Sequence, residues 1–303
     1  MAAHSKRLIR VAAPVAAAVA ALAAALVAAL TVAPAAVEAQ AGRRIISLVP
    51  ALTEMLYAIG AGPQVVAVSS FDDFPPEVKA LPRVGALLDP DVERILTLRP
   101  DLVITYGSQG SLEAQLGRAG IRTFSYRHGG IEALLRTVRD LGAATGRAEE
   151  ANRAATALEA QLEAIRARVR GRVRPRVLLV FGRHPQSLQQ IQVSGGVGFL
   201  HELLEAAGGI NIFADVPRES VQPSHETLLT RAPDVILEIH ATNAVEGADA
   251  TRERGVWSAL ASVPAVRSGR VHFLNGEYLV IPGPRIVRAA EAFARVLHPE
   301  AFR

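Results

Sequence analysis

The sequence predicts an α/β fold made of two Rossmann-like lobes joined by one long backbone helix. Short apolar strands alternate with helices over residues 44–144 and again from residue 176, which is typical of lobes built on a mostly parallel sheet. Between them lies a segment without glycine or proline, and the two stretches share sequence motifs. The expected divisions are a signal peptide (1–41), an N-terminal lobe (42–145), a linking helix (146–171) and a C-terminal lobe (172–303).

The first 41 residues have the pattern of an export signal. Three basic residues precede an apolar run from Val11 to Leu30, and cleavage is expected after Ala39 or Ala41, where small residues follow the run. A retained membrane anchor is the alternative, because the run approaches the length of a span. Its alanine-rich composition favours cleavage. Because the chain has no cysteine to carry a lipid anchor, we expect the mature protein to diffuse freely in the periplasm.

The first lobe is predicted from short apolar runs that are bounded by glycine and proline. The run that starts at Arg44 stops at Pro50, and the helical spacing that follows stops at Gly60. The expected strands are 44–49, 65–68, 101–105 and 123–126, and the expected helices are 53–59, 91–98, 112–119 and 131–144.

The linking helix is predicted over Arg147 to Arg170. Its apolar positions recur at steps of three and four residues, which places them on one face of a helix about 36 Å long. Gly171 and Pro175 end it. The apolar positions are Ala151, Ala155, Leu158, Leu162, Ile165 and Val169.

The alternation of strands and helices then restarts in the second lobe. A final helix begins just after Pro284, where proline is well tolerated. The expected strands are 176–181, 190–193, 235–239 and 271–274, and the expected helices are 199–207 and 285–297.

The two halves contain an internal repeat. The segment from Glu93 to Ile104 matches the segment from Glu226 to Leu237, and Leu52–Leu56 matches Leu200–Leu204 in the same order. Two matches on either side of the linking helix indicate duplicated lobes. The repeat places Glu93 and Glu226 on the first turn of equivalent short helices, where a carboxylate suits the helix dipole.

Composition excludes several classes of function. Without cysteine there is no disulfide, no thiolate catalysis and no cysteine-based metal cluster. No basic run with interleaved aromatics occurs, so a nucleic-acid partner is not expected. The segment 201–205 begins like a zinc-protease helix but has Glu205 where a second histidine is required. A secreted metal-dependent enzyme is therefore the disfavoured rival class.

The most informative motifs lie in the first lobe. They are Ile46-Ser47-Leu48-Val49-Pro50-Ala51-Leu52-Thr53-Glu54, Ser69-Ser70-Phe71-Asp72-Asp73-Phe74-Pro75-Pro76 and Val92-Glu93-Arg94-Ile95, with Pro100–Ile104, Gly208–Phe213 and Pro284–Ile286 further along. With these motifs the chain resembles the helical-backbone (class III) substrate-binding proteins of ABC importers, and within them the vitamin B12-binding branch. The resemblance covers the whole chain after the leader.

This resemblance implies a monomer that captures a ligand between its lobes without turning it over. The ligand implied is cobalamin, with haem or a ferric siderophore as the alternative, and no intrinsic cofactor is implied. The membrane subunits of an ABC importer are the implied partner. Glu93 and Glu226 are implied to contact arginines of those subunits, one lobe to each subunit.

Candidate ligand contacts follow the predicted strands, because ligands of open α/β sheets bind at the carboxyl ends of strands. In the vitamin B12-binding branch an aromatic residue stands at the place of Phe71, and the segment matching 277–281 touches the ligand. Phe71 and Tyr278 are therefore the first candidates. The full set is Phe71, Tyr106, Arg127, His128, Arg183, His184, Glu277, Tyr278 and Leu279.

The candidate cleft departs from the branch in its aromatic residues. Tryptophans of the branch fall here on Leu87, Tyr106 and Ser220, and the only tryptophan, Trp257, is predicted in a helix packed on its lobe. A flat macrocycle is thus expected to meet fewer rings.

Polar residues offer other contacts to a ligand. Arg127, Arg183 and Arg218 offer positive charge to carboxylates or phosphate. His128, His184 and His240 lack the spacing of a metal chelate, so no protein metal site is expected, although one of these histidines could ligate a metal chelate axially.

Overall fold

The computed structural model describes residues 43–241 and 247–303, and residues 44–303 form one compact unit. The expected signal peptide lies outside the described residues. Over the described residues, no helix combines the length and the apolar character that a membrane span requires.

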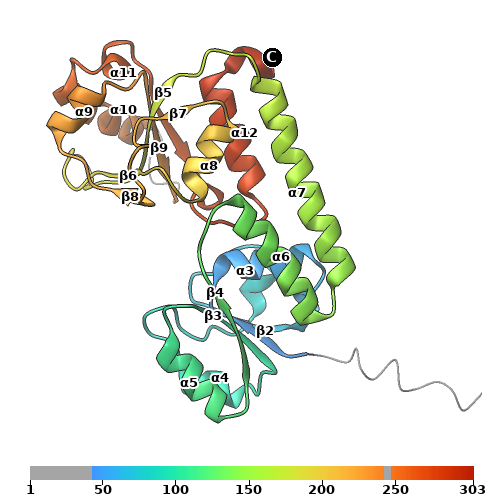
Figure 1. The fold of residues 1–303 in the computed structure, drawn as a ribbon. Coiled ribbons are helices and arrows are strands. Elements are labelled where there is room, and N and C mark those ends of the chain that lie inside the picture. The colour runs from blue at the N-terminus through green and yellow to red at the C-terminus, as the bar shows by residue number, and fades with distance from the viewer. Residues whose placement is uncertain (1–42, 242–246) are drawn as a thin grey trace, which may run out of the picture. The chain divides into compact units, whose positions relative to one another are not determined.

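The first half contains a four-stranded parallel sheet in the order β2-β1-β3-β4 (Figure 1). The expected strands are confirmed, because short apolar runs that are buried on both faces suit a parallel sheet. The strands are β1 (Ile45–Ser47), β2 (Val65–Val68), β3 (Leu102–Tyr106) and β4 (Arg122–Tyr126). The helices are α3 (Pro50–Ala58), α4 (Val92–Thr97), α5 (Gly110–Arg118) and α6 (Ile131–Thr145).

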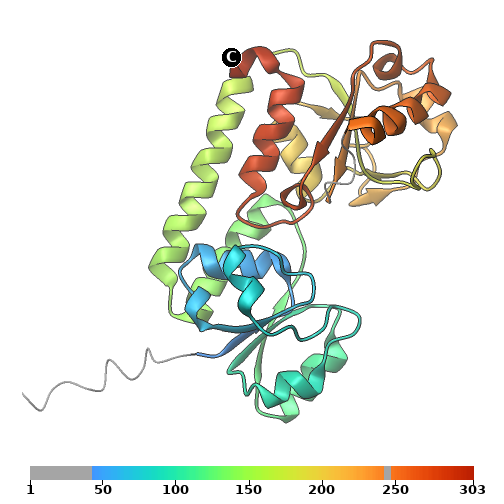
Figure 2. The same cartoon turned by 180° about the vertical axis from the view of Figure 1, so that it is seen from behind.

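The linking helix is α7 (Ala148–Val169), and all six predicted apolar positions are buried. Glu149 and Glu150 stand in its first turn and Arg166 and Arg168 in its last, as the helix dipole favours. The helix packs against α6 and against α12 (Ile286–Leu297), as Figures 1 and 2 show from opposite sides. The predicted long helix is therefore confirmed.

The second half contains a six-stranded sheet, in which the path β10-β9-β5-β6-β8 is joined by β7 beside β5. The expectation of a mostly parallel sheet holds for β5, β7, β9 and β10, but β6 and β8 are antiparallel. The strands are β5 (Arg176–Gly182), β6 (Gln192–Ser194), β7 (Ile210–Asn211), β8 (Ser220–Val221), β9 (Val235–His240) and β10 (Val271–Asn275).

Helices and short 3-10 turns surround this second sheet. Trp257 is fully buried, but it lies in a 3-10 turn rather than in the predicted helix. The helices are α8 (Phe199–Ala206), α9 (His225–Arg231), α10 (Gly247–Val256), α11 (Pro264–Arg267) and α12. The 3-10 turns of the molecule are η1 (Gly62–Gln64), η2 (Pro76–Ala80), η3 (Trp257–Leu260), η4 (Glu277–Leu279) and η5 (Pro299–Phe302).

One apolar core runs through both halves. It includes Leu52 of α3, Leu162 of α7, Leu203 of α8 and Phe293 of α12, each at most 1% exposed. Each sheet also packs against a smaller apolar cluster of its own, one in the first half and one in the second. The boundaries drawn at residues 145 and 172 remain a prediction, since the halves share this core.

The internal repeat is confirmed at the level of single hydrogen bonds. The Asp101 carboxylate accepts a bond from the Arg44 backbone N–H at 2.7 Å, and Asp234 accepts the equivalent bond from Arg176 at 3.0 Å. Each arginine also donates from Nη2, at 2.8 Å, to a carbonyl at the end of α4 or α9. In each half, hydrogen bonds thus join the start of a strand (β1 or β5) to the C-terminal end of the equivalent helix (α4 or α9).

Candidate ligand-binding site

A cavity of about 350 Å³ has walls from both halves of the molecule. Tyr106 is the last residue of β3 and His128 lies in the loop after β4, and both share the cavity with Phe181 and Phe199 of the second half. Val280, from the segment after η4, adds an apolar surface. The cavity therefore lies at the carboxyl ends of the strands, where the sequence predicts the ligand site.

Aromatic rings from both halves form part of the wall of this cavity, and we call them the aromatic wall. Tyr106 and Tyr126 lie 5.7 Å apart between ring centroids, and His128 meets Phe199 edge-on at 5.3 Å. Tyr126 Oη and His128 Nδ1 are 3.3 Å apart, and burial raises the pKa of the Tyr126 phenol. Phe181 and Phe199 of the second half also line the cavity, so it holds rings that the strand-end candidates did not include.

The other candidates of the first half and of segment 277–279 lie outside the lining of this cavity. Phe71 is 70% exposed, and Arg127 is exposed without a hydrogen bond or ion pair to any other described residue. Glu277 and Tyr278 are half-buried, and Arg288 lies over the Tyr278 ring at 4.7 Å.

Leu279 differs from these because it is fully buried in the shared core. Its side chain packs the segment against the core and presents no surface to a ligand. The residue of this segment that lines the cavity is its neighbour Val280, which is not among the candidates.

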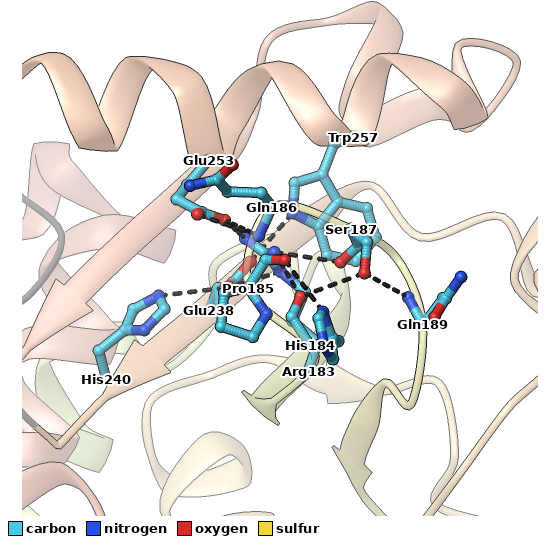
Figure 3. Close-up of polar contacts among 10 residues, drawn as sticks. All are labelled: Arg183, His184, Pro185, Gln186, Ser187, Gln189, Glu238, His240, Glu253 and Trp257. Atoms are coloured by element: carbon cyan, nitrogen blue, oxygen red, sulfur yellow. Dashed lines mark hydrogen bonds and ion pairs between the residues drawn. The ribbon is translucent and has the colours of Figure 1, made fainter.

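Arg183 stands in a buried ion-pair network (Figure 3). Its side chain is 3% exposed, with Nε 2.9 Å from Glu238 Oε1 and Nη2 2.7 Å from Glu253 Oε2. Trp257 Nε1 donates to Glu238 Oε2 at 3.0 Å, and His240 Nε2 lies 3.1 Å from Glu238 Oε1. Burial raises the pKa of Glu238, but His240, Arg183 and Trp257 outweigh it and hold this pKa below its ordinary value.

This network changes the expectation for Arg183. Its charge is already matched by two carboxylates, so a ligand anion would have to displace one of them. The geometry gives Arg183 a structural role: its two ion pairs hold the loop after β5 against β9 and α10.

A second hollow of about 520 Å³ lies beside this loop, and it contains His184. The ring of His184 is exposed, with Nδ1 3.2 Å from the carbonyl oxygen of Pro185. The remaining lining consists mainly of Gly182 and the amide side chains Gln190, Gln192 and Gln222.

Glu93 and Glu226 are both exposed and occupy equivalent places on α4 and α9. Each helix is capped at its N-terminus, where the Asp91 carboxylate accepts from Arg94 N–H and the Ser224 hydroxyl accepts from Thr227 N–H. Neither glutamate forms an ion pair with another described residue. Both carboxylates are therefore free to contact a partner.

Among the cavity-lining residues that the candidate set does not include are two aromatic ones, Phe181 and Phe199. Phe181 ends a predicted strand, so the strand-end rule that selected Arg183 points to it equally well. Phe199 opens a predicted helix, and no sequence signal places it across from His128. Over residues 43–241 and 247–303, no group of three or more acidic or histidine side chains is placed to hold a metal ion.

Comparison with known proteins identifies the family. The model of the periplasmic binding protein family matches residues 45–278. The chain belongs to this family. It is 32% identical over 259 residues to the vitamin B12-binding protein of Salmonella typhimurium, a match that covers 85% of this chain and 91% of the relative. The predicted family and fold are confirmed.

Solved structures of periplasmic binding proteins share this fold. The periplasmic vitamin B12 binding protein BtuF of Vibrio cholerae is 29% identical, with a TM-score of 0.71, over 86% of this chain and 98% of that one. A periplasmic haem-binding protein of Pseudomonas aeruginosa is 27% identical, with a TM-score of 0.71, over 85% and 93% of the two chains.

Proposed function

We propose that this periplasmic binding protein captures cobalamin, or a related metal chelate, and delivers it to an ABC importer. The observation that carries the proposal is the aromatic cavity with walls from both halves. A flat macrocycle fits such walls, because rings stack on its faces while the rest of the ligand reaches the polar loops. The identity to vitamin B12-binding proteins along almost the whole described chain supports the same ligand.

Delivery is proposed to use Glu93 and Glu226. Their equivalent positions give two exposed carboxylates, one on each half, that match a partner with two equivalent basic sites. Exposed ion pairs of this kind orient a transient complex more than they tighten it. We place the mature protein in the periplasm as a monomer, after cleavage of its leader.

Haem or a ferric siderophore is the second candidate ligand. His128 favours it, because its ring lines the cavity while Nδ1 lies beside the Tyr126 hydroxyl, which leaves Nε2 for an axial contact to iron. The similarity to haem-binding proteins supports the same alternative.

The test is calorimetric titration of the mature protein with cyanocobalamin, haemin and a ferric siderophore, each paired with an absorption spectrum. Cyanocobalamin is expected to bind at micromolar concentration or tighter, and to be recovered unchanged after denaturation. Absence of cyanocobalamin binding beside tight haemin binding would transfer the proposal to haem. Recovery of a modified ligand would indicate an enzyme.

A further inference from the structure

The second hollow adjoins the aromatic cavity. Phe181 lines the cavity and the next residue, Gly182, lines the hollow. Ser220 also lines the cavity, and its hydroxyl donates to Gln192 Oε1 in the hollow at 2.8 Å. A ligand that fills the aromatic cavity therefore has the hollow beside it.

Amide side chains dominate the chemistry of this hollow. Gln192 is the first residue of β6 and Gln222 directly follows β8, so both stand next to the antiparallel pair of Val193 and Val221, and both line the hollow. Gln190 joins them from the loop before β6, with its backbone in the left-handed region at φ 51°. Strained residues of this kind are concentrated at ligand clamps. The side chains of Gln190 and Gln222 are exposed, and neither forms a hydrogen bond to another described residue.

The charges around the cavity and the hollow limit which substituents the edge, or rim, of a macrocyclic ligand can carry. Of the described residues that line the hollow and the cavity, Arg183 alone carries a permanent positive charge, and Glu238 and Glu253 neutralise it. Glu219 adds an exposed carboxylate to the cavity wall. A carboxylate-bearing ligand edge would meet Glu219 and no unpaired permanent cation among the described residues that line the cavity and the hollow, whereas a neutral amide edge meets groups that both donate and accept hydrogen bonds.

We infer that the glutamine-lined hollow binds the neutral, carboxamide-bearing rim of a metal chelate whose flat face lies against the aromatic wall. This inference rests on the proposed function and sharpens it. Reciprocal amide pairs satisfy donor and acceptor on both partners, so the hollow selects carboxamide-substituted macrocycles over macrocycles with free carboxylates.

Two variants test the inference, Gln192→Leu and Gln222→Leu, with Gln189→Leu as the matched control. Gln189 is exposed on the same loop, and its side chain lies outside the lining of the hollow. Each of the two variants is expected to weaken cyanocobalamin binding about tenfold, the loss of one well-formed hydrogen bond, while the control keeps wild-type affinity. Melting temperatures of all three variants verify that they fold.

A second experiment changes the ligand instead of the protein. Cyanocobalamin in which one corrin amide has been hydrolysed to a carboxylate is expected to bind wild-type protein about tenfold more weakly, and Gln222→Arg is expected to restore that affinity.

The outcomes separate the two proposals. Wild-type affinity for cyanocobalamin in the folded double variant Gln192→Leu/Gln222→Leu would overturn the inference and leave the proposed function intact. Wild-type protein that binds haemin but no cyanocobalamin would overturn the inference and transfer the proposed function to haem, because the edge of haem carries free carboxylates.

Discussion

Glu54 and Glu202 occupy equivalent positions in the two halves, and each carboxylate is bound by the opposite half. Arg285, just before α12, donates to Glu54 from Nη2 at 2.6 Å and from Nε at 2.9 Å. The backbone N–H of Ile131, the first residue of α6, donates to Glu202 Oε2 at 2.6 Å. The repeated Leu-x-Glu-x-Leu motif thus supplies two reciprocal contacts between the halves.

Glycines leave room for both contacts. A Cβ at Gly283 would lie 2.9 Å from Glu54 Oε2, and a Cβ at Gly130 would collide with the Glu202 carboxylate. The segment 201–205, which resembles a zinc-protease helix, therefore has a structural part. Its Glu202 accepts a hydrogen bond from the backbone of the other half.

The first prediction concerns the Glu54 contact. Glu54→Ala is expected to lower the free energy of unfolding by about 3–5 kcal/mol, because it leaves the mostly buried Arg285 guanidinium without its partner. Urea unfolding measures the change. Glu149→Ala, at an exposed glutamate of α7, is the control and should change the free energy by less than about 0.5 kcal/mol. Equal stability of the two variants would show that the Glu54–Arg285 contact does not stabilise the fold.

The second prediction concerns the ring of Tyr106. Tyr106→Leu is expected to weaken cyanocobalamin binding about tenfold, because it removes a stacking surface, whereas Tyr106→Phe should keep most of the affinity. Calorimetric titration measures both. If Tyr106→Phe lost as much affinity as Tyr106→Leu, the hydroxyl rather than the ring would carry the contact.

The third prediction concerns delivery. The double variant Glu93→Ala/Glu226→Ala is expected to abolish cobalamin uptake by cells that depend on this protein, while calorimetry shows unchanged ligand affinity. Both side chains are exposed, so the melting temperature should stay within a few degrees of wild type. Unchanged uptake by the folded double variant would refute the docking role.

The fourth prediction separates Arg127 and Arg183, two of the three arginines that were expected to offer charge to anions. Arg183→Met is expected to destabilise the fold by about 3–5 kcal/mol, because Glu238 and Glu253 lose their buried partner. Arg127→Met should leave stability unchanged, since its side chain is exposed. Denaturant unfolding of both variants checks this, and an Arg183→Met variant as stable as wild type would show that the network is dispensable.

The fifth prediction follows from Asp72, which is 1% exposed. Its Oδ2 accepts from the Ser69 N–H at 2.9 Å and from the Ser69 hydroxyl, while burial raises the pKa of the carboxyl above its ordinary 3.8. The folded state then binds the proton more tightly than the unfolded state, so stability falls as pH rises from below 3.8 through the raised pKa.

Asp72→Asn removes this titration. The stability of the variant relative to wild type is therefore expected to rise with pH over that window, as measured by urea unfolding at a series of pH values from 3 to 7. Parallel pH profiles of the two proteins would rule out a raised pKa at Asp72.

Local chemistry made much of this fold predictable. The apolar stripe of α7 obeys the helical period, and the repeated Pro-Asp segments precede a buried strand in both halves, so neighbours along the chain determine both. The antiparallel pairing of β6 with β8 was harder to predict from the sequence, because β8 has only two residues and Val221 pairs with Val193, 28 positions away.

The sequence by itself determined the duplicated α/β halves, the linking helix and the exposed pair Glu93 and Glu226, because these depend on periodicity and on contacts within a few residues. Only the tertiary structure decided which strand-end residues line the cavity between the halves. It turned Arg183 toward Glu238 and Glu253, buried Leu279 in the core and brought Phe199 against His128. The physical reason is that burial and pairing of these side chains depend on partners far away in the sequence.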